Sequence, residues 1–82
     1  MNSGTINIVV KKTGALKKPQ DPAEERITIK TDSTVDMLLD ALKFEANHKK
    51  FINVSVNNKS ANRWTVLKDG DEVVLFLPVG GG

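Results

Sequence analysis

The chain has 82 residues, 27% of them charged and 39% hydrophobic, with a formal net charge of +2 and no cysteine. The length fits one small domain, and the lack of cysteine excludes disulfides, a thiolate nucleophile and a cysteine-ligated zinc site. No apolar stretch approaches the ~20 residues of a membrane helix, and residues 1–5 lack the pattern of a secretory signal. We therefore expect a cytoplasmic protein with no membrane partner.

Two strands and a long connection are predicted for the first third of the sequence. Residues 5–10 and 25–30 alternate apolar and polar side chains, the pattern of half-buried strands, and we expect them to pair antiparallel. Residues 11–24 hold a glycine, two prolines and four lysines, which indicates an exposed loop. Because no aromatic residue lies among these lysines and the net charge is low, we expect no nucleic-acid partner. The lysines are Lys11, Lys12, Lys17 and Lys18.

A single amphipathic helix is predicted for residues 34–47. Asp32, Ser33 and Thr34 supply oxygen atoms that can cap a helix, and Asp36 follows Ser33 at the spacing of a capping box. Apolar residues then recur at helical spacing, which gives the helix one face for a core. These apolar residues are Val35, Leu38, Leu39, Leu42 and Ala46.

Two further strands are predicted after the helix. Residues 51–56 alternate again and lead to Asn57 and Asn58, which favour a turn. Residues 68–71, with the sequence Lys-Asp-Gly-Asp, predict a tight turn into a final strand over residues 72–78. This order of elements predicts an α+β domain in which one sheet packs on one main helix.

The final strand is apolar on both of its faces, although one helix can cover only one face of a small sheet. We expect Val73 and Leu75 to face the core, because the strand follows an exposed turn. Val74 and Phe76 would then face outward and form a docking surface just before the chain terminus.

Three glycines, Gly80, Gly81 and Gly82, follow this strand. Glycine contributes no side-chain packing and loses much backbone freedom on ordering, so these residues add little to the stability of the fold. A peptide without side chains can instead enter a narrow slot and bring its carboxyl group to a reactive centre. We therefore divide the chain into a domain over residues 1–79 and a flexible tail over residues 80–82.

Other residues that could act as a general base, a metal ligand or a stacking surface are better explained by structural roles. His48 lies among lysines at the predicted end of the helix, which favours a solvated or capping role over that of a general base. Asp69 and Asp71 flank a turn glycine, so turn geometry explains them better than a metal site. Phe51 and Trp64 are expected in the core or at its edge, because a small domain needs large side chains for burial.

The ending of the sequence, residues 67–82, resembles that of the MoaD/ThiS-type sulfur-carrier family. In that family an Asp-Gly-Asp turn precedes an apolar strand and a terminal Gly-Gly, as Asp69, Gly70 and Asp71 do here. The resemblance is weaker over the rest of the chain. It implies a ubiquitin-like β-grasp fold with a mixed four- to five-stranded sheet packed on one main helix.

The resemblance also implies a function. An E1-like enzyme would adenylate the carboxylate of Gly82, and a sulfur donor protein would convert it to a thiocarboxylate for cofactor biosynthesis. ATP and magnesium would belong to the activating partner, so the chain itself would bind no cofactor or metal and would not be an enzyme. Gly80 and Gly81 would thread the tail into the partner, and a larger synthase subunit is a further expected partner. The expected docking residues are Val74, Phe76, Pro78 and Val79.

Several alternatives remain open at this stage. The family usually ends in two glycines, and a third would lengthen the tail by roughly 3.5 Å. The ending around Phe76 is similar to molybdopterin-synthase small subunits, whereas Asn62-Arg63-Trp64 is similar to thiamine-pathway carriers, so the pathway is not assigned. A ubiquitin-like modifier joined to lysines through Gly82, or a passive interaction module, would also explain the pattern.

Overall fold

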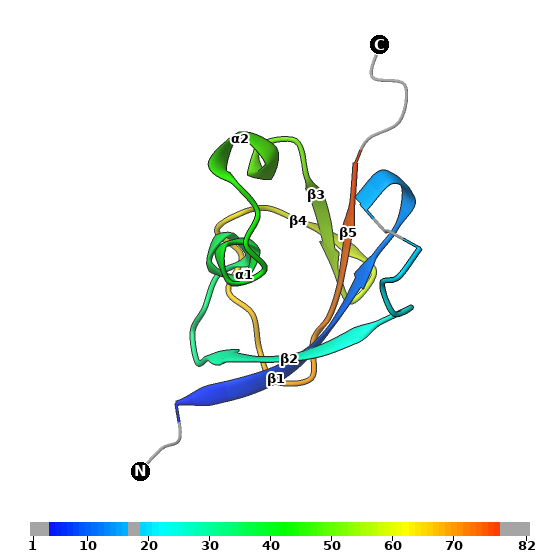
Figure 1. Cartoon of the computed structure of the whole chain (residues 1–82). Coiled ribbons are helices and arrows are strands. Elements are labelled where there is room, and N and C mark those ends of the chain that lie inside the picture. Colours follow the sequence, from blue (N-terminus) through cyan, green and yellow to red (C-terminus); the bar gives the residue numbers. More distant parts are fainter. Residues whose placement is uncertain (1–3, 17–18, 78–82) are drawn as a thin grey trace.

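The computed structural model describes residues 4–16 and 19–77, which form five strands, two α-helices and one 3-10 helix (Figure 1). Pro78, Val79 and the three glycines lie outside the described residues, as does the expected boundary between domain and tail. Neither α-helix in the described part is long and apolar enough to cross a membrane. The elements are β1 (Thr5–Lys12), η1 (Gly14–Leu16), β2 (Glu25–Lys30), α1 (Val35–Ala41), α2 (Ala46–Lys49), β3 (Asn53–Val56), β4 (Lys59–Ala61) and β5 (Glu72–Phe76).

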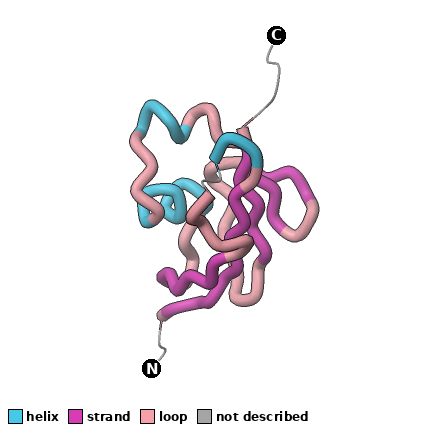
Figure 2. Tube along the Cα trace, turned by 45° about the vertical axis from the view of Figure 1, so that its right-hand side comes forward, coloured by secondary structure: helices cyan, strands magenta, loops and turns pink. Residues whose placement is uncertain are grey.

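The strands form one mixed sheet in the order β2-β1-β5-β3-β4. β1 pairs antiparallel with β2, as predicted, and parallel with β5, while β3 pairs antiparallel with both β4 and β5. The last strand of the sequence is therefore the middle strand of the sheet. Both α-helices lie on the same side of the strands in Figures 1 and 2.

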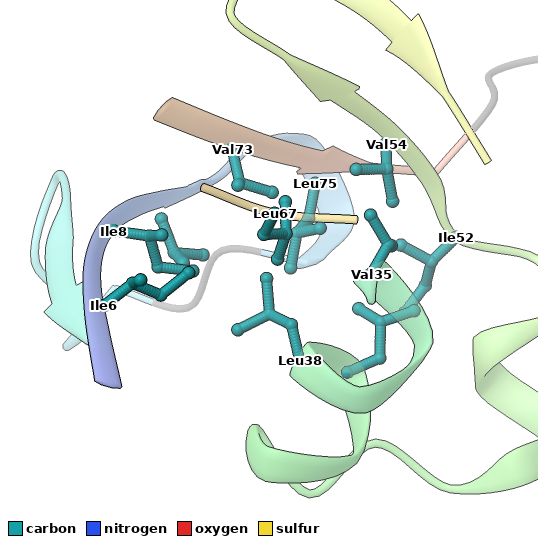
Figure 3. Packing of buried hydrophobic residues seen from close by; sticks show 11 residues of the cluster. Ile6, Ile8, Val35, Leu38, Ile52, Val54, Leu67, Val73 and Leu75 are labelled. Carbon is teal, nitrogen blue, oxygen red and sulfur yellow. The ribbon is translucent and has the colours of Figure 1, made fainter. Parts of the chain in front are cut away.

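The hydrophobic core lies between the sheet and α1, and β1, β3 and β5 direct side chains toward that helix (Figure 3). The alternation predicted for residues 5–10 places the isoleucines and Val10 inward. Val73 and Leu75 are 0% exposed, which confirms the face assigned to the final strand. The buried hydrophobic residues are Ile6, Ile8, Val10, Val35, Leu38, Leu39, Ile52, Val54, Leu67, Val73 and Leu75.

The prediction of one helix over residues 34–47 is wrong, because α1 ends at Ala41 and α2 begins at Ala46. Lys43 has a φ of 69°, which cannot continue a right-handed helix. The N–H of Lys43 donates to the carbonyl of Asp40 at 2.9 Å, and the N–H of Phe44 donates to that of Leu39 at 3.1 Å. These bonds form a Schellman motif, which usually has glycine where this chain has Lys43.

The start of the helix agrees with the prediction, but the capping pair differs. Thr34 is the N-cap, and its hydroxyl accepts a hydrogen bond from the N–H of Met37 at 3.3 Å. The backbone N–H of Thr34 in turn contacts the Met37 sulfur at 3.5 Å. The capping box is therefore formed by Thr34 and Met37 rather than by Ser33 and Asp36.

The strand boundaries also differ in places. β1 continues through Lys12 into the expected loop, and β3 begins at Asn53 rather than at residue 51. β4 was expected to be part of a polar loop. Asn57 and Asn58 have φ values of 53° and 68°, and Val56 pairs with Lys59, so a two-residue turn of the I′ type returns the chain alongside β3. The sheet therefore has the upper of the two expected strand numbers.

Candidate carboxyl-terminal docking site

The turn before β5 is held by hydrogen bonds that connect it to β1. Gly70 has a φ of 86°, and its N–H donates to the carbonyl of Asn7 at 2.8 Å. Oδ1 of Asp69 accepts from the N–H of Asn7 at 2.7 Å, and Oδ2 of Asp71 accepts from the N–H of Lys68 at 2.8 Å. These carboxylates therefore shape the turn and set where β5 begins, as the turn geometry predicted.

β5 then carries the chain through the centre of the sheet toward the tail. Figure 1 shows that it ends on the side of the molecule where α2 lies, away from the start of β1. Leu77 is half-buried and is the last described residue. Pro78 and Val79 separate it in sequence from the three glycines of the expected tail. The surroundings of Phe76 and Leu77 are therefore the described surface nearest to that tail in sequence.

The outward face of β5 is less apolar than the sequence suggests. Val74 and Phe76 are half-buried and lie on the face opposite the core, as expected. However, Val74 lies between Lys11 of β1 and Ser55 of β3, and Phe76 pairs with Asn53. Because Lys11 Nζ lies 3.0 Å from Oε2 of Glu72, the hydrogen bond to that carboxylate raises the pKa of Lys11. A partner at this face would meet two apolar side chains within a polar surround.

Two grooves lie beside the end of β5. The sheet-side groove, about 570 Å³ in volume, lies by β3 and β4, and its walls include Asn53, Ser60, Arg63, Trp64 and Phe76. The helix-side groove has a volume of about 380 Å³. It is lined by Leu16, Phe44, His48, Phe51, Ile52 and Leu77. Phe76 and Leu77 thus each contribute to a different groove.

The two large aromatic residues expected in the core or at its edge are on the surface instead. Trp64 is 69% exposed and Phe51 is 63% exposed. The aliphatic neighbours Leu67 and Ile52 occupy the buried positions in these segments. The expectation that a small domain buries its largest side chains fails here. The space between the sheet and α1 is already filled by branched aliphatic side chains. The exposure of Phe51 follows the alternation of the strand, since Ile52 and Val54 face inward, and this signal was available in the sequence.

A network of charged side chains holds the walls of both grooves to α1. Nζ of Lys49, in α2, lies 2.6 Å from Oδ1 of Asp40 and 3.0 Å from Oδ1 of Asp36. Nη2 and Nε of Arg63 donate to the same Asp36 oxygen at 2.8 and 3.0 Å. The Arg63 guanidinium also lies 5.5 Å from the centre of the Trp64 ring. No local sequence pattern indicates this network, because its members lie on three separate segments.

The network shifts the titration of its members. Hydrogen bonds from Arg63 and then Lys49 hold the pKa of Asp36 below its ordinary value. Hydrogen bonds to Asp40 and then Asp36 raise the pKa of Lys49. Backbone bonds reinforce the connection, since the N–H of Val35 donates to the carbonyl of Thr65 and that of Asp36 to the carbonyl of Arg63, both at 2.9 Å. The loop that carries Trp64 is therefore tied to the start of α1.

Comparisons with known proteins identify a family and solved structures that share this fold. The model of the ThiS family matches residues 14–82. No curated protein matches significantly. Among solved structures, SAMP1 from Haloferax volcanii is 28% identical, with 93% of this chain and 99% of that chain covered and a TM-score of 0.75.

Two further solved structures are described as molybdopterin-converting factors. Subunit 1 from Pyrococcus furiosus is 26% identical, with 90% of this chain and 99% of that chain covered and a TM-score of 0.72. A complex of subunits 1 and 2 from Helicobacter pylori matches at 27% identity, with 94% and 100% covered and a TM-score of 0.58. The fold expected from the sequence is confirmed: the chain has the ubiquitin-like β-grasp fold and belongs to the ThiS family.

Proposed function

We propose that the chain is a sulfur carrier that acts through the carboxylate of Gly82. The family match carries this proposal, because it extends through residue 82 and so includes the three glycines. In this function an E1-like enzyme adenylates Gly82, and the adenylate is converted to a thiocarboxylate. The thiocarboxylate then donates sulfur in cofactor biosynthesis of the molybdopterin or thiamine type.

The chemistry explains why activation is needed. A free carboxylate is a poor electrophile, so one of its oxygens first attacks the α-phosphorus of ATP and releases pyrophosphate. The resulting mixed anhydride has AMP as a good leaving group, and a sulfur nucleophile from the donor protein can attack its carbonyl carbon. ATP and magnesium belong to the activating enzyme. This chain supplies the electrophilic carbon and the docking surface, and acts as a protein cosubstrate rather than as a catalyst.

The docking residues of the proposal lie on either side of the last described position. Val74 and Phe76 are half-buried on the open face of the sheet, and Pro78 and Val79 continue from them in sequence. Gly80 and Gly81 would thread into the active site of the partner. The similarity to subunit 1 in the complex of two molybdopterin-converting factor subunits supports a larger synthase subunit as a second partner. We place the protein in the cytoplasm, which suits a cysteine-free chain.

A second candidate is a ubiquitin-like modifier whose Gly82 carboxyl is joined to lysines of other proteins. The similarity to SAMP1, a small archaeal modifier protein, favours it. Activation would be the same, but a lysine amine rather than sulfur would displace AMP.

Intact-mass measurement tests the main proposal. The full chain is incubated with its cognate activating enzyme, ATP, magnesium and a sulfur source. A gain equal to the difference between one sulfur and one oxygen atom, located on Gly82 by fragmentation, is expected. Lysine-linked adducts without this gain would favour the modifier. A chain lacking Gly81 and Gly82 should lose either product, whereas full pathway function after this deletion would indicate a passive module.

A further inference from the structure

The helix-side groove is an apolar surface whose described lining residues include none of the docking residues proposed above. Phe44 and Leu16 are half-buried in it, Ile52 forms its floor, and Phe51 is 63% exposed at its edge. His48 is the polar member of its lining. The helix-side groove forms because the Schellman motif at Lys43 turns the chain out of α1. As a result, Phe44 and His48 of α2 line one groove together with Leu16 of η1.

The length of the tail limits where a partner can stand. Five residues follow Leu77, and five residues span at most about 18 Å when fully extended. An enzyme that reacts with Gly82 must therefore place its reactive centre within that distance of Leu77. Because a centre that excludes water is surrounded by protein, the surface around its entrance must meet the surface around Leu77. The helix-side groove is part of that surface, since Leu77 is one of its walls.

The charges around the groove indicate the chemistry of the partner. Leu16, Phe44 and His48 also line an adjoining cavity of about 360 Å³, whose lining further includes Leu42, Lys43 and the ion-paired Lys12 and Asp21. Lys43 forms no ion pair with another of the described residues. A segment with an apolar side chain next to a carboxylate would fill the groove and pair with this lysine.

We propose that the helix-side groove is a second docking site for the activating enzyme, and that it takes an apolar side chain from an acidic segment at the entrance to that enzyme's active site. This inference rests on the proposed function. The partner would hold the chain on both sides of Leu77, through Phe76 on one side and Phe51 on the other. Contacts on both sides of Leu77 would fix the orientation of the chain on the enzyme. This lowers the entropy cost of bringing the Gly82 carboxylate to the reactive centre.

The test measures adenylation kinetics with the cognate activating enzyme, using the full chain as the varied substrate. Phe51→Ser should raise the KM for the chain about tenfold, the effect of losing a contact worth about 1.4 kcal/mol, while kcat stays unchanged because Gly82 is intact. The control is Val66→Ser, which removes a 48% exposed apolar side chain that lines neither groove. Its KM should match wild type. Urea unfolding checks that both variants fold.

A charge reversal tests the acidic nature of the partner. Lys43→Glu should raise KM and weaken the dependence of KM on salt, whereas Lys59→Glu, an exposed lysine on β4, should leave both closer to wild type. A wild-type chain that is never adenylated would overturn the proposed function and this inference together. Normal adenylation with equal KM values for Phe51→Ser and Val66→Ser would overturn only the inference. So would a Phe51→Ser defect confined to a later complex with a synthase subunit.

Discussion

The parallel pair β1 and β5 and the segment over residues 42–66 contribute to the site in different ways. In the strand pair, Val10, Val73 and Leu75 are at most 2% exposed, and the strands pair in regular register. In the segment, two left-handed turns change the direction of the chain, and the side chains of Phe51 and Trp64 are on the surface. The strand pair fixes the position of the end of β5, while the irregular segment shapes the grooves beside that end.

Neighbouring residues in both regions thus have opposite exposure, and we propose that the buried one stabilises the fold while the exposed one contacts a partner. Leu75 is in the core, and Phe76 faces a groove. Ile52 is in the core, and Phe51 is exposed. Variants that alter one member of such a pair should therefore separate the free energy of unfolding from the affinity for a partner.

The largest effect is expected for Leu75→Ala. Removing a fully buried leucine from the middle strand leaves a cavity and should lower the free energy of unfolding by about 2 to 5 kcal/mol. This is a large share of the stability of so small a domain. Urea unfolding monitored by the fluorescence of Trp64 measures it. A loss below about 1 kcal/mol would mean that the strand pair is not the stable part of the fold.

Phe76→Asp should affect binding instead. We expect an increase of about tenfold in the KM of the activating enzyme for the chain, because a charge replaces a contact residue of the sheet-side groove. The free energy of unfolding should change by much less than in Leu75→Ala, since Phe76 lies on the open face. Loss of folding with no specific effect on KM would reverse the comparison.

Gly70→Ala tests the turn that starts β5. At a φ of 86° a side chain is strained, and nothing lies within 4 Å of an added Cβ. The cost should therefore come from the backbone alone and amount to about 1 to 2 kcal/mol of unfolding free energy. Thermal unfolding measures it. A neutral substitution would show that the conformation of the turn does not limit stability.

Lys43→Gly should stabilise the protein by about 0.5 to 1 kcal/mol, because glycine adopts the left-handed conformation of this helix stop without strain. The matched control is Lys50→Gly. Lys50 has a φ of −68°, so glycine there should only add freedom to the unfolded chain and lower stability. Urea unfolding compares the two. If both variants lose stability equally, the helix does not stop at Lys43 as described.

The smallest effect is expected for Asp36→Asn, which removes the negative charge shared by Lys49 and Arg63 but keeps an oxygen that can accept a hydrogen bond. The lowered pKa of Asp36 adds stability above the ordinary aspartate pKa of about 3.9, and this contribution is lost as pH falls through the lowered value. The variant should therefore be less stable than wild type at neutral pH and approach it in acid. Urea unfolding across this range measures the difference, and a constant difference would contradict the assignment.

The order of the amino acids was enough to predict the alternating strands, the start of the helix at Thr34, the turn at Gly70 and the family. These features depend on neighbouring residues, and local patterns are sufficient to predict them. The exposed turn before the final strand also identified Val73 and Leu75 as core residues. The role of Gly82 was carried by the same local pattern and stays a proposal.

The end of the helix, the burial of the aromatic residues and the pairing of the charges follow instead from packing in three dimensions. Lys43 adopts a left-handed conformation that its residue type does not favour, and Trp64 is excluded by a core that aliphatic side chains already fill. The contacts between Lys49, Asp36 and Arg63 join segments distant in sequence. Such features depend on how the sheet, the helices and the loops pack together, so no local pattern specifies them.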